Sequence, residues 1–275
     1  MNAADALLFL SYAFIQKAVV AGSFIAVLCA TLGVFLVFRR LAMIGDGLAH
    51  AAFGSVALAL LLNVAPAALA IPLVVLNALG IVKLAERPRG LGDAAIGIVS
   101  AFGIAFGVLV SSVAGGFNVD LFSYLFGSIL SISFGEAVAS VVLSVLVLGS
   151  VAFFYHDLLS ATFDQEFARV SGVRVGILNR LLAALTAVTV VLAMKVVGIM
   201  LVSSMLIMPP MTALQVSRGF RMTILLASGV SVFAVLAGIA VSFGFDLPAG
   251  ATIVMMNFLL LIAAFAYRSC VRPHA

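Results

Sequence analysis

The amino-acid sequence predicts an all-α, polytopic integral membrane protein with a single domain over residues 1–275. Hydrophobic residues make up 65% of the chain and charged residues only 9%, whereas soluble domains are about 25% charged. The apolar runs are continuous and about twenty residues long, which is the length of a helix that crosses a bilayer. They lack the alternating segments of about ten residues that mark a membrane β-barrel. We therefore expect about eight to nine transmembrane helices.

Nine apolar runs, separated by turns, qualify as spans. Clustered charge or proline ends several of them: Arg39-Arg40 follows the first run, Pro66 precedes the third, and a basic stretch at 83–90 follows the third. A shorter apolar stretch at 6–14 is expected to lie in the membrane interface. The expected spans are residues 15–38, 41–62, 67–84, 94–113, 134–155, 177–194, 196–216, 222–243 and 251–267.

Three regions have sequence features that bear on helix packing and helix continuity. Gly103 and Gly107, in the fourth span, have the GxxxG spacing that lets helices pack closely. Residues 114–133, after that span, are only half apolar and predict a re-entrant or interfacial piece. Pro209-Pro210, in the seventh span, should break or bend its helix. If that span is partly re-entrant the protein has eight full crossings, and otherwise it has nine.

The basic residues predict which side faces the cytoplasm. With the spans above, all but Lys17 and Lys195 of the 14 Lys and Arg residues fall on one side. Surplus Lys and Arg gather in cytoplasmic loops, so this side is expected inside the cell and the N-terminus outside. The net charge of +4 therefore reports topology and gives no reason to expect nucleic-acid binding.

Missing motifs disfavour several classes of protein. The chain has no GxxxxGK[ST] nucleotide-binding loop, no HExxH and no GxSxG. An enzyme is therefore not expected, and an active pump built on this chain must use a separate ATPase. Cys29 and Cys270 make no credible disulfide framework or metal-ligand pair. No permanently bound cofactor is predicted.

Asp46 and His50 are the strongest functional candidates. They lie near the start of an apolar span, where an ionisable group costs about 2.5–3.5 kcal/mol on insertion scales. Their i, i+4 spacing puts both side chains on one helix face. A carboxylate and an imidazole that converge are half of a transition-metal site. The alternatives are a proton relay and a structural hydrogen bond within the bundle, and spacing alone does not choose a metal over a proton.

The one long polar stretch, residues 156–176, has a helical pattern inside it. Between residues 160 and 172, Phe163, Phe167 and Val170 recur on one face of a predicted short amphipathic helix. Periodicity alone favours a solvated cytoplasmic connector. The functional alternative is a helix that docks into a groove on a cytoplasmic partner.

From about residue 14 to residue 266, the chain resembles the membrane permease of bacterial zinc, manganese and iron ABC importers. The most specific pieces are GDGLAHA, which contains Asp46 and His50, and DQEFARVSGV in the polar loop. The resemblance is closest to the zinc-importing members. The stretches that carry it are IGDGLAHAAFGSVALALLL, VDLFSYLFGSIL, FDQEFARVSGV, AMKVVGIMLVSSMLIMPP and FDLPAGATIV.

This resemblance implies a single permease domain, multi-pass in the inner cell membrane, that imports a divalent transition metal. Two copies would pair around one central pathway on two cytoplasmic ATPase subunits. A periplasmic or lipid-anchored metal-binding protein would deliver the metal. Asp46 and His50 match the family's path-lining residues, and the loop at 156–176 matches its coupling helix. The residues then expected to contact the ATPase are Asp164, Glu166, Ala168 and Gly172.

The motifs favour zinc as the transported metal, with manganese and iron as alternatives. The GDGLAH and YLFGSIL stretches resemble the zinc importers more than the manganese importers. A histidine with a carboxylate suits zinc but also serves manganese and iron. Two other interpretations are a proton-coupled secondary metal carrier and, behind it, a scaffold without a transport role.

Overall fold

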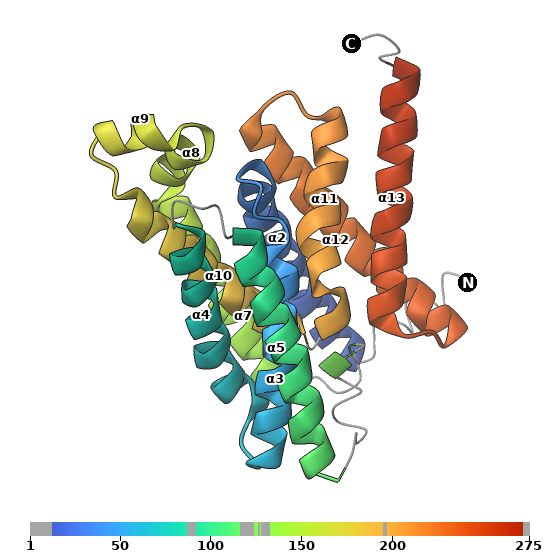
Figure 1. Ribbon diagram of the computed structural model, residues 1–275. Helices are drawn as coiled ribbons and strands as arrows, with labels where there is room; N and C mark the ends of the chain where they lie inside the picture. Colours follow the sequence, from blue (N-terminus) through green and yellow to red (C-terminus); the bar gives the residue numbers. More distant parts are fainter. Residues whose placement is uncertain are drawn as a thin grey trace.

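The structure is a computed structural model that describes residues 13–86, 92–115, 124–125, 127, 133–194 and 197–271. Within these residues it contains helices and no strands, which confirms the predicted all-α class (Figure 1). The elements are α2 (Ala13–Phe38), α3 (Ile44–Leu61), α4 (Pro66–Ala85), α5 (Gly92–Val113), α7 (Phe134–Phe153), α8 (Tyr155–Phe163), α9 (Gln165–Val170), α10 (Val175–Ala193), the 3-10 turn η2 (Ile199–Leu201), α11 (Val202–Val216), α12 (Phe220–Phe245) and α13 (Ala249–Val271).

Eight of the described helices are long and apolar enough to cross a membrane, and α11 is a shorter apolar helix. Together they correspond to the nine predicted segments, with ends displaced by a few residues. The fifth segment ends earlier than predicted, at Phe153, because Tyr155 already begins α8. The stretches at 6–14 and 114–133 lie mostly outside the described residues.

The prolines of the seventh segment do not break its helix, so that part of our prediction is wrong. Pro209 and Pro210 lie inside α11, and the interruption comes earlier, at Gly198 (φ +95°) and η2. Pro210 has no N–H to offer the carbonyl of Leu206. That carbonyl oxygen lies against Gly33 of α2, where no Cβ is in the way.

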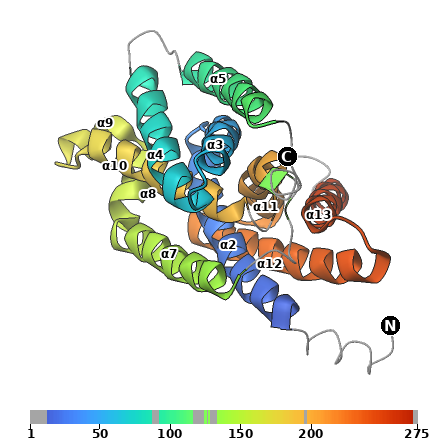
Figure 2. The ribbon, with the colours of Figure 1, turned by 90° about the horizontal axis from the view of Figure 1, so that it is seen from below.

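Three helices, α2, α3 and α10, form the interior of the bundle. In their most apolar windows 72% of α2, 72% of α3 and 56% of α10 is buried, against 22–33% for the other candidate spans. Figure 2 shows the remaining long helices arranged around them. The outer helices therefore present broad apolar faces, which a membrane protein turns toward lipid.

Glycine allows α3 and α5 to approach closely. A Cβ on Gly103 would lie 2.5 Å from the backbone oxygen of His50, and one on Gly107 would lie 2.5 Å from the ring of Phe53. The predicted GxxxG spacing is thus confirmed as a packing face. Because these contacts leave no room between the two helices, α5 limits where the backbone at His50 can lie.

Basic residues gather at one end of the bundle, as the topology prediction requires. Arg268 near the end of α13 donates from Nη1 to Oε1 of Gln215 at the end of α11 (2.9 Å). Arg221 at the start of α12 lies over the ring of Tyr155 in α8, 5.6 Å from its centroid. Both α8 and α9 lie at this end (Figure 1). The positive-inside rule predicts that this end faces the cytoplasm.

Candidate functional site

Asp46 and His50 lie one turn apart on α3, as their spacing predicts. Nε2 of His50 and Oδ2 of Asp46 are 3.6 Å apart, and 19% of the histidine side chain and 37% of the aspartate side chain is exposed. Two ligands of one tetrahedral metal ion lie about 3.4 Å apart when each bond is about 2.0–2.1 Å long. The pair therefore has the spacing and the opening to hold one ion from one side.

Two glycines bring neighbouring helices against α3 on either side of Asp46. A Cβ on Gly45 would lie 2.5 Å from Cδ1 of Leu206 in α11, and one on Gly47 would lie 2.9 Å from Cγ2 of Ile96 in α5. Asp46 also stands in the first turn of α3, where the positive end of the helix dipole favours a carboxylate. The candidate carboxylate is therefore carried by a helix end that α5 and α11 hold in place.

Within the described residues, one chain brings two candidate metal ligands to this position. No group of three or more His, Cys, Asp or Glu side chains comes together within the part of the chain that the structure describes. Zinc and related ions take about four to six ligands. An ion held by Asp46 and His50 would therefore need further ligands from outside the described residues of one chain.

Backbone hydrogen bonds close the turn that leads from α2 into α3. Arg40 has a positive φ of 58°, and its N–H donates to the carbonyl of Val37 (3.1 Å). The N–H of Leu41 donates to the carbonyl of Leu36 (2.8 Å). This pattern is a Schellman motif, which usually has glycine at the position of positive φ. The N–H of Ile44 then donates to the carbonyl of Leu41 (3.0 Å), so the turn is short and internally bonded.

Arg39, at the start of this turn, donates to acceptors on two other helices. Its Nε donates to Oγ1 of Thr162 (2.9 Å) and its Nη2 to the carbonyl of Leu158 (3.3 Å), both in α8. Its Nη1 donates to Oδ1 of Asn179 in α10 (2.8 Å). Burial lowers the pKa of the guanidinium to about 10, so Arg39 keeps its charge at neutral pH. The sequence marks Arg39 only as a topology signal, because its partners lie 119–140 residues further along.

The polar loop folds as two helices rather than the single helix predicted from 160 to 172. α8 ends at Phe163, and Asp164 then caps α9 by accepting from the N–H of Phe167 (2.9 Å). The backbone of Asp164 is extended, which interrupts the helix. The prediction failed here because apolar spacing does not register a capping residue at the centre of the pattern.

The four residues expected at the ATPase take different places in this loop. Asp164 caps the start of α9, and Gly172 follows its end with a φ of +87°, which glycine adopts without strain. Glu166 is exposed and pairs with Arg169 at 2.7 Å. Ala168 is fully buried, so it supports α9 from beneath.

Apolar side chains are exposed along the same loop. Phe163, Phe167 and Val170 are 64%, 65% and 88% exposed. We name these three residues the apolar loop surface. Large apolar groups on the cytoplasmic side of a membrane protein are costly in water unless another surface covers them.

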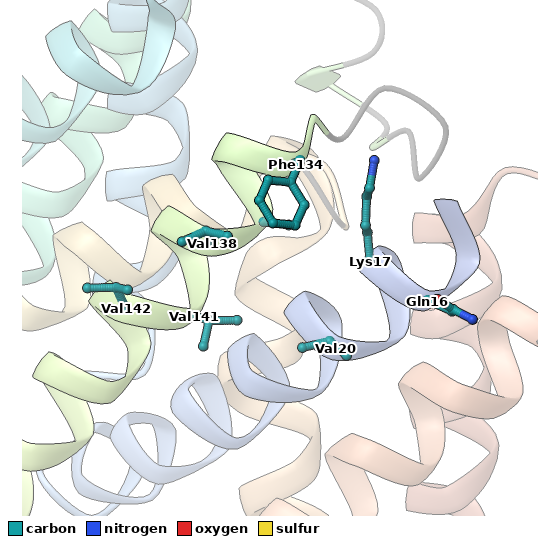
Figure 3. Close-up of a pocket in the computed structure, with 8 residues that line it drawn as sticks. Gln16, Lys17, Val20, Phe134, Val138, Val141 and Val142 are labelled. Carbon is teal, nitrogen blue, oxygen red and sulfur yellow. The ribbon is translucent and has the colours of Figure 1, made fainter. Parts of the chain in front are cut away.

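Three cavities among the described residues have neither Asp46 nor His50 in their lining. One of about 590 Å³ lies at the basic end of the bundle between α2, α4, α9 and α10, and Arg39, Glu86 and Asn179 border it. One of about 200 Å³ lies between α3, α4 and α5. The third, of about 330 Å³, lies between α2 and α7; it is lined mainly by valines, with Lys17 at its edge (Figure 3). This third cavity is lined by no carboxylate, histidine or cysteine and is unsuited to a metal ion.

Known proteins resemble this chain over nearly its whole length. A family model described as the ABC 3 transport family matches residues 11–268. The manganese transport system membrane protein MntC of Halalkalibacterium halodurans is 32% identical over 94% of this chain and 88% of its own. The high-affinity zinc uptake system membrane protein ZnuB of Haemophilus influenzae is 31% identical over 90% of this chain and 95% of its own. A chain in the structure of PsaBC from Streptococcus pneumoniae in complex with Fab is similar, with a TM-score of 0.86, 28% identity and coverage of 96% of this chain and 95% of that chain.

The matching relatives are named for more than one metal, so the family does not single out zinc. Their membrane location agrees with the eight long apolar helices of the described structure. The chain belongs to the ABC 3 transport family, as a multi-pass membrane permease of metal ABC importers.

Proposed function

We propose that this chain carries a divalent transition metal, zinc in the first place, into the cytoplasm along Asp46 and His50, driven by ATP hydrolysis on separate subunits. The observation that carries the proposal is the pair itself. A carboxylate and an imidazole lie 3.6 Å apart, partly open, on a helix that is largely buried in a membrane bundle. Ionisable groups at such a position are costly and mark transport pathways by default.

A second copy of the chain would complete the ligand set. The described residues of one protomer offer two ligands, and two copies around a two-fold axis would bring four side chains to one pathway. A transit site must also release its cargo, so its affinity should be low. Selection of the metal then falls on the periplasmic or lipid-anchored metal-binding protein that delivers it.

The loop helices α8 and α9 provide the contact with the ATPase in this proposal. The apolar loop surface is the kind of anchor that docks into a hydrophobic groove. Asp164 and Gly172 set the two ends of α9, and Glu166 adds a charge at its exposed face. Ala168 has the supporting role, because it is buried within the chain.

Zinc is favoured over manganese and iron by the ligand types of Asp46 and His50 and by the sequences of the motifs around them. Imidazole nitrogen is a common zinc ligand, and a carboxylate completes a typical mixed set. Manganese and iron also accept both ligand types. The metal must therefore be decided by experiment.

Uptake in a host that lacks its own zinc and manganese importers tests the proposal. The chain is supplied with its cognate ATPase and binding protein, as wild type and as Asp46→Ala and His50→Ala. Asp93→Ala is the matched control, because Asp93 is an exposed carboxylate in the first turn of α5. We expect wild type and the control to rescue growth under zinc starvation, and both site variants to fail while still inserting.

The other outcomes separate the alternatives. Rescue under manganese starvation alone would keep the pathway and overturn the choice of zinc. Full activity in both site variants would mean that Asp46 and His50 are structural. Uptake by the chain without an ATPase, abolished by a protonophore, would replace the proposal with a proton-coupled secondary carrier.

A further inference from the structure

We propose that Arg39 is a positioning residue that ties the α8–α9 loop to the start of α3, so that movement of the loop displaces Asp46. The inference rests on the proposed function, because it concerns how a conformational change in the ATPase would reach the metal pathway. The link runs from α8 through one guanidinium to the turn that precedes α3.

The guanidinium spans helices that are distant in sequence. Arg39 directly follows the end of α2, and it donates to Thr162 and Leu158 in α8 and to Asn179 in α10. All three acceptor groups are uncharged. A half-buried cation held by neutral acceptors depends on the direction of each hydrogen bond, and a planar guanidinium with donors in a fixed fork meets that demand.

The path from Arg39 to Asp46 is short and closed by hydrogen bonds. The Schellman motif at Arg40 and Leu41 ends α2, and the N–H of Asp46 donates to the carbonyl of Met43 (3.1 Å) in the first turn of α3. A turn of this kind moves as one piece, since bending it breaks several backbone hydrogen bonds. A displacement applied at Arg39 therefore reaches the candidate carboxylate.

Aromatic packing beside Arg39 holds the same elements together without fixing their register. The ring of Phe38 lies 5.7 Å from that of Phe163 in α8 and 5.3 Å from that of Phe220 in α12. Aromatic pairs are favourable over a range of centroid separations of about 4.5–7 Å, so these rings can shift and stay in contact. The hydrogen bonds of Arg39 depend on distance and angle, so they set how far α8 can move before the turn must follow.

Lysine cannot replace Arg39 in this arrangement. Its ammonium is a point charge at the end of a flexible stem, and it lacks the fixed fork that reaches two helices at once. Arg39→Lys therefore keeps the positive charge, which the membrane topology needs, and removes the geometry. It is the variant that separates the link from the charge.

The experiment uses the complex of the chain with its ATPase and binding protein, reconstituted in proteoliposomes. Zinc uptake and ATP hydrolysis are measured on the same sample, and their ratio is the readout. We expect Arg39→Lys to lower the number of ions imported per ATP by about tenfold, within the 5–150-fold range of typical coupling between sites, while hydrolysis continues. Arg40→Lys, at the exposed neighbouring position, should leave the ratio unchanged.

A milder pair of variants covers the case in which Arg39→Lys fails to assemble. Thr162→Val removes one acceptor and should lower the ratio, whereas Thr162→Ser keeps the hydroxyl and should preserve it. Thr162→Val added to Arg39→Lys should cause no further loss, because both remove the same link.

Three results would overturn the inference. The first is a wild-type ratio in Arg39→Lys, or in Thr162→Val if Arg39→Lys does not assemble. The second is that Thr162→Val loses uptake and hydrolysis in equal proportion to its loss of assembled complex, which marks a purely structural role. The third is a wild-type complex without ATP-dependent uptake, which rejects the proposed function and this inference with it.

Discussion

Replacing Gly103 by alanine tests how closely α5 must approach α3, the helix that carries Asp46 and His50. A Cβ there would lie 2.5 Å from the backbone oxygen of His50 and 2.8 Å from the backbone nitrogen of Ala51. Carbon and oxygen atoms in weak contact are about 3.3–3.6 Å apart, so α5 must retreat from α3 by about 0.8 Å or more. Both neighbours are backbone atoms and cannot rotate aside.

The cost follows from the balance of overpacking and helix propensity. Overpacking a tight interface costs about 1–3 kcal/mol, and alanine favours the helix over glycine by about 1 kcal/mol. Gly97 is the matched control, because it lies on the same helix and a Cβ there meets nothing within 4 Å. The two variants share the propensity gain, so Gly103→Ala should be less stable than Gly97→Ala by about 1–3 kcal/mol.

Thermal unfolding of the purified protein in detergent compares the two variants, and metal uptake by the assembled complex shows the functional effect. We expect Gly103→Ala to unfold at a lower temperature than wild type and Gly97→Ala at the same or a higher temperature. Uptake should fall in Gly103→Ala alone, since the added Cβ would press against the backbone of His50. Equal unfolding temperatures for the two variants would refute the reasoning that α3 and α5 pack too closely at Gly103 to admit a Cβ atom.

Three further predictions concern the turn after α2 and the loop that contains α9. Gly172→Ala places a side chain at a φ of +87°, which costs about 1–2 kcal/mol; less ATPase should copurify, and unchanged copurification would contradict the capping role. Arg40→Gly relieves a φ of 58° and should leave the unfolding temperature equal or higher; a lower temperature would count against a strained turn. Phe167→Ser removes an apolar group that is 65% exposed; ATPase binding should weaken without a change in unfolding temperature, and retained binding would argue against the apolar loop surface.

The sequence predicts those parts of the fold that depend on local patterns. Hydropathy located the spans because each helix must satisfy its own backbone in the membrane. The spacing of Gly103 and Gly107 predicted a packing face, since small residues one turn apart make a groove on any helix. The placement of Asp46 and His50 on one helix face followed from helical geometry, and in the structure Oδ2 of Asp46 lies 3.6 Å from Nε2 of His50.

Features that depend on contacts with residues elsewhere in the chain could not be predicted from the sequence. The role of Arg39 rests on acceptors in α8 and α10, and neither position carries a sequence signal for that contact. The helix through Pro209 and Pro210 continues because the carbonyl of Leu206 finds room against Gly33, which only the packing of α11 on α2 provides. Where a second copy or an ATPase would contact the chain is likewise a property of surfaces, not of local periodicity.

The short helix α11 has a consequence for how the protein enters the membrane during synthesis. Its 15 residues span about 22 Å at about 1.5 Å per residue, which is less than the hydrocarbon thickness of about 30 Å. Gly198 and η2 interrupt the chain where a longer helix would continue. A segment of this kind cannot satisfy its backbone in lipid by itself.

Its neighbours must therefore enclose it, and two of them are made later. α11 contacts α2, α3, α12 and α13, and the fully buried Asn257 of α13 donates from Nδ2 to Sδ of Met205 in α11 (3.3 Å). Because α12 and α13 follow α11 in the chain, α11 reaches its final surroundings only after both have been synthesised. A chain that stops before α13 would lack part of the surface that encloses the interrupted segment, which makes α13 a requirement for the packing of α11.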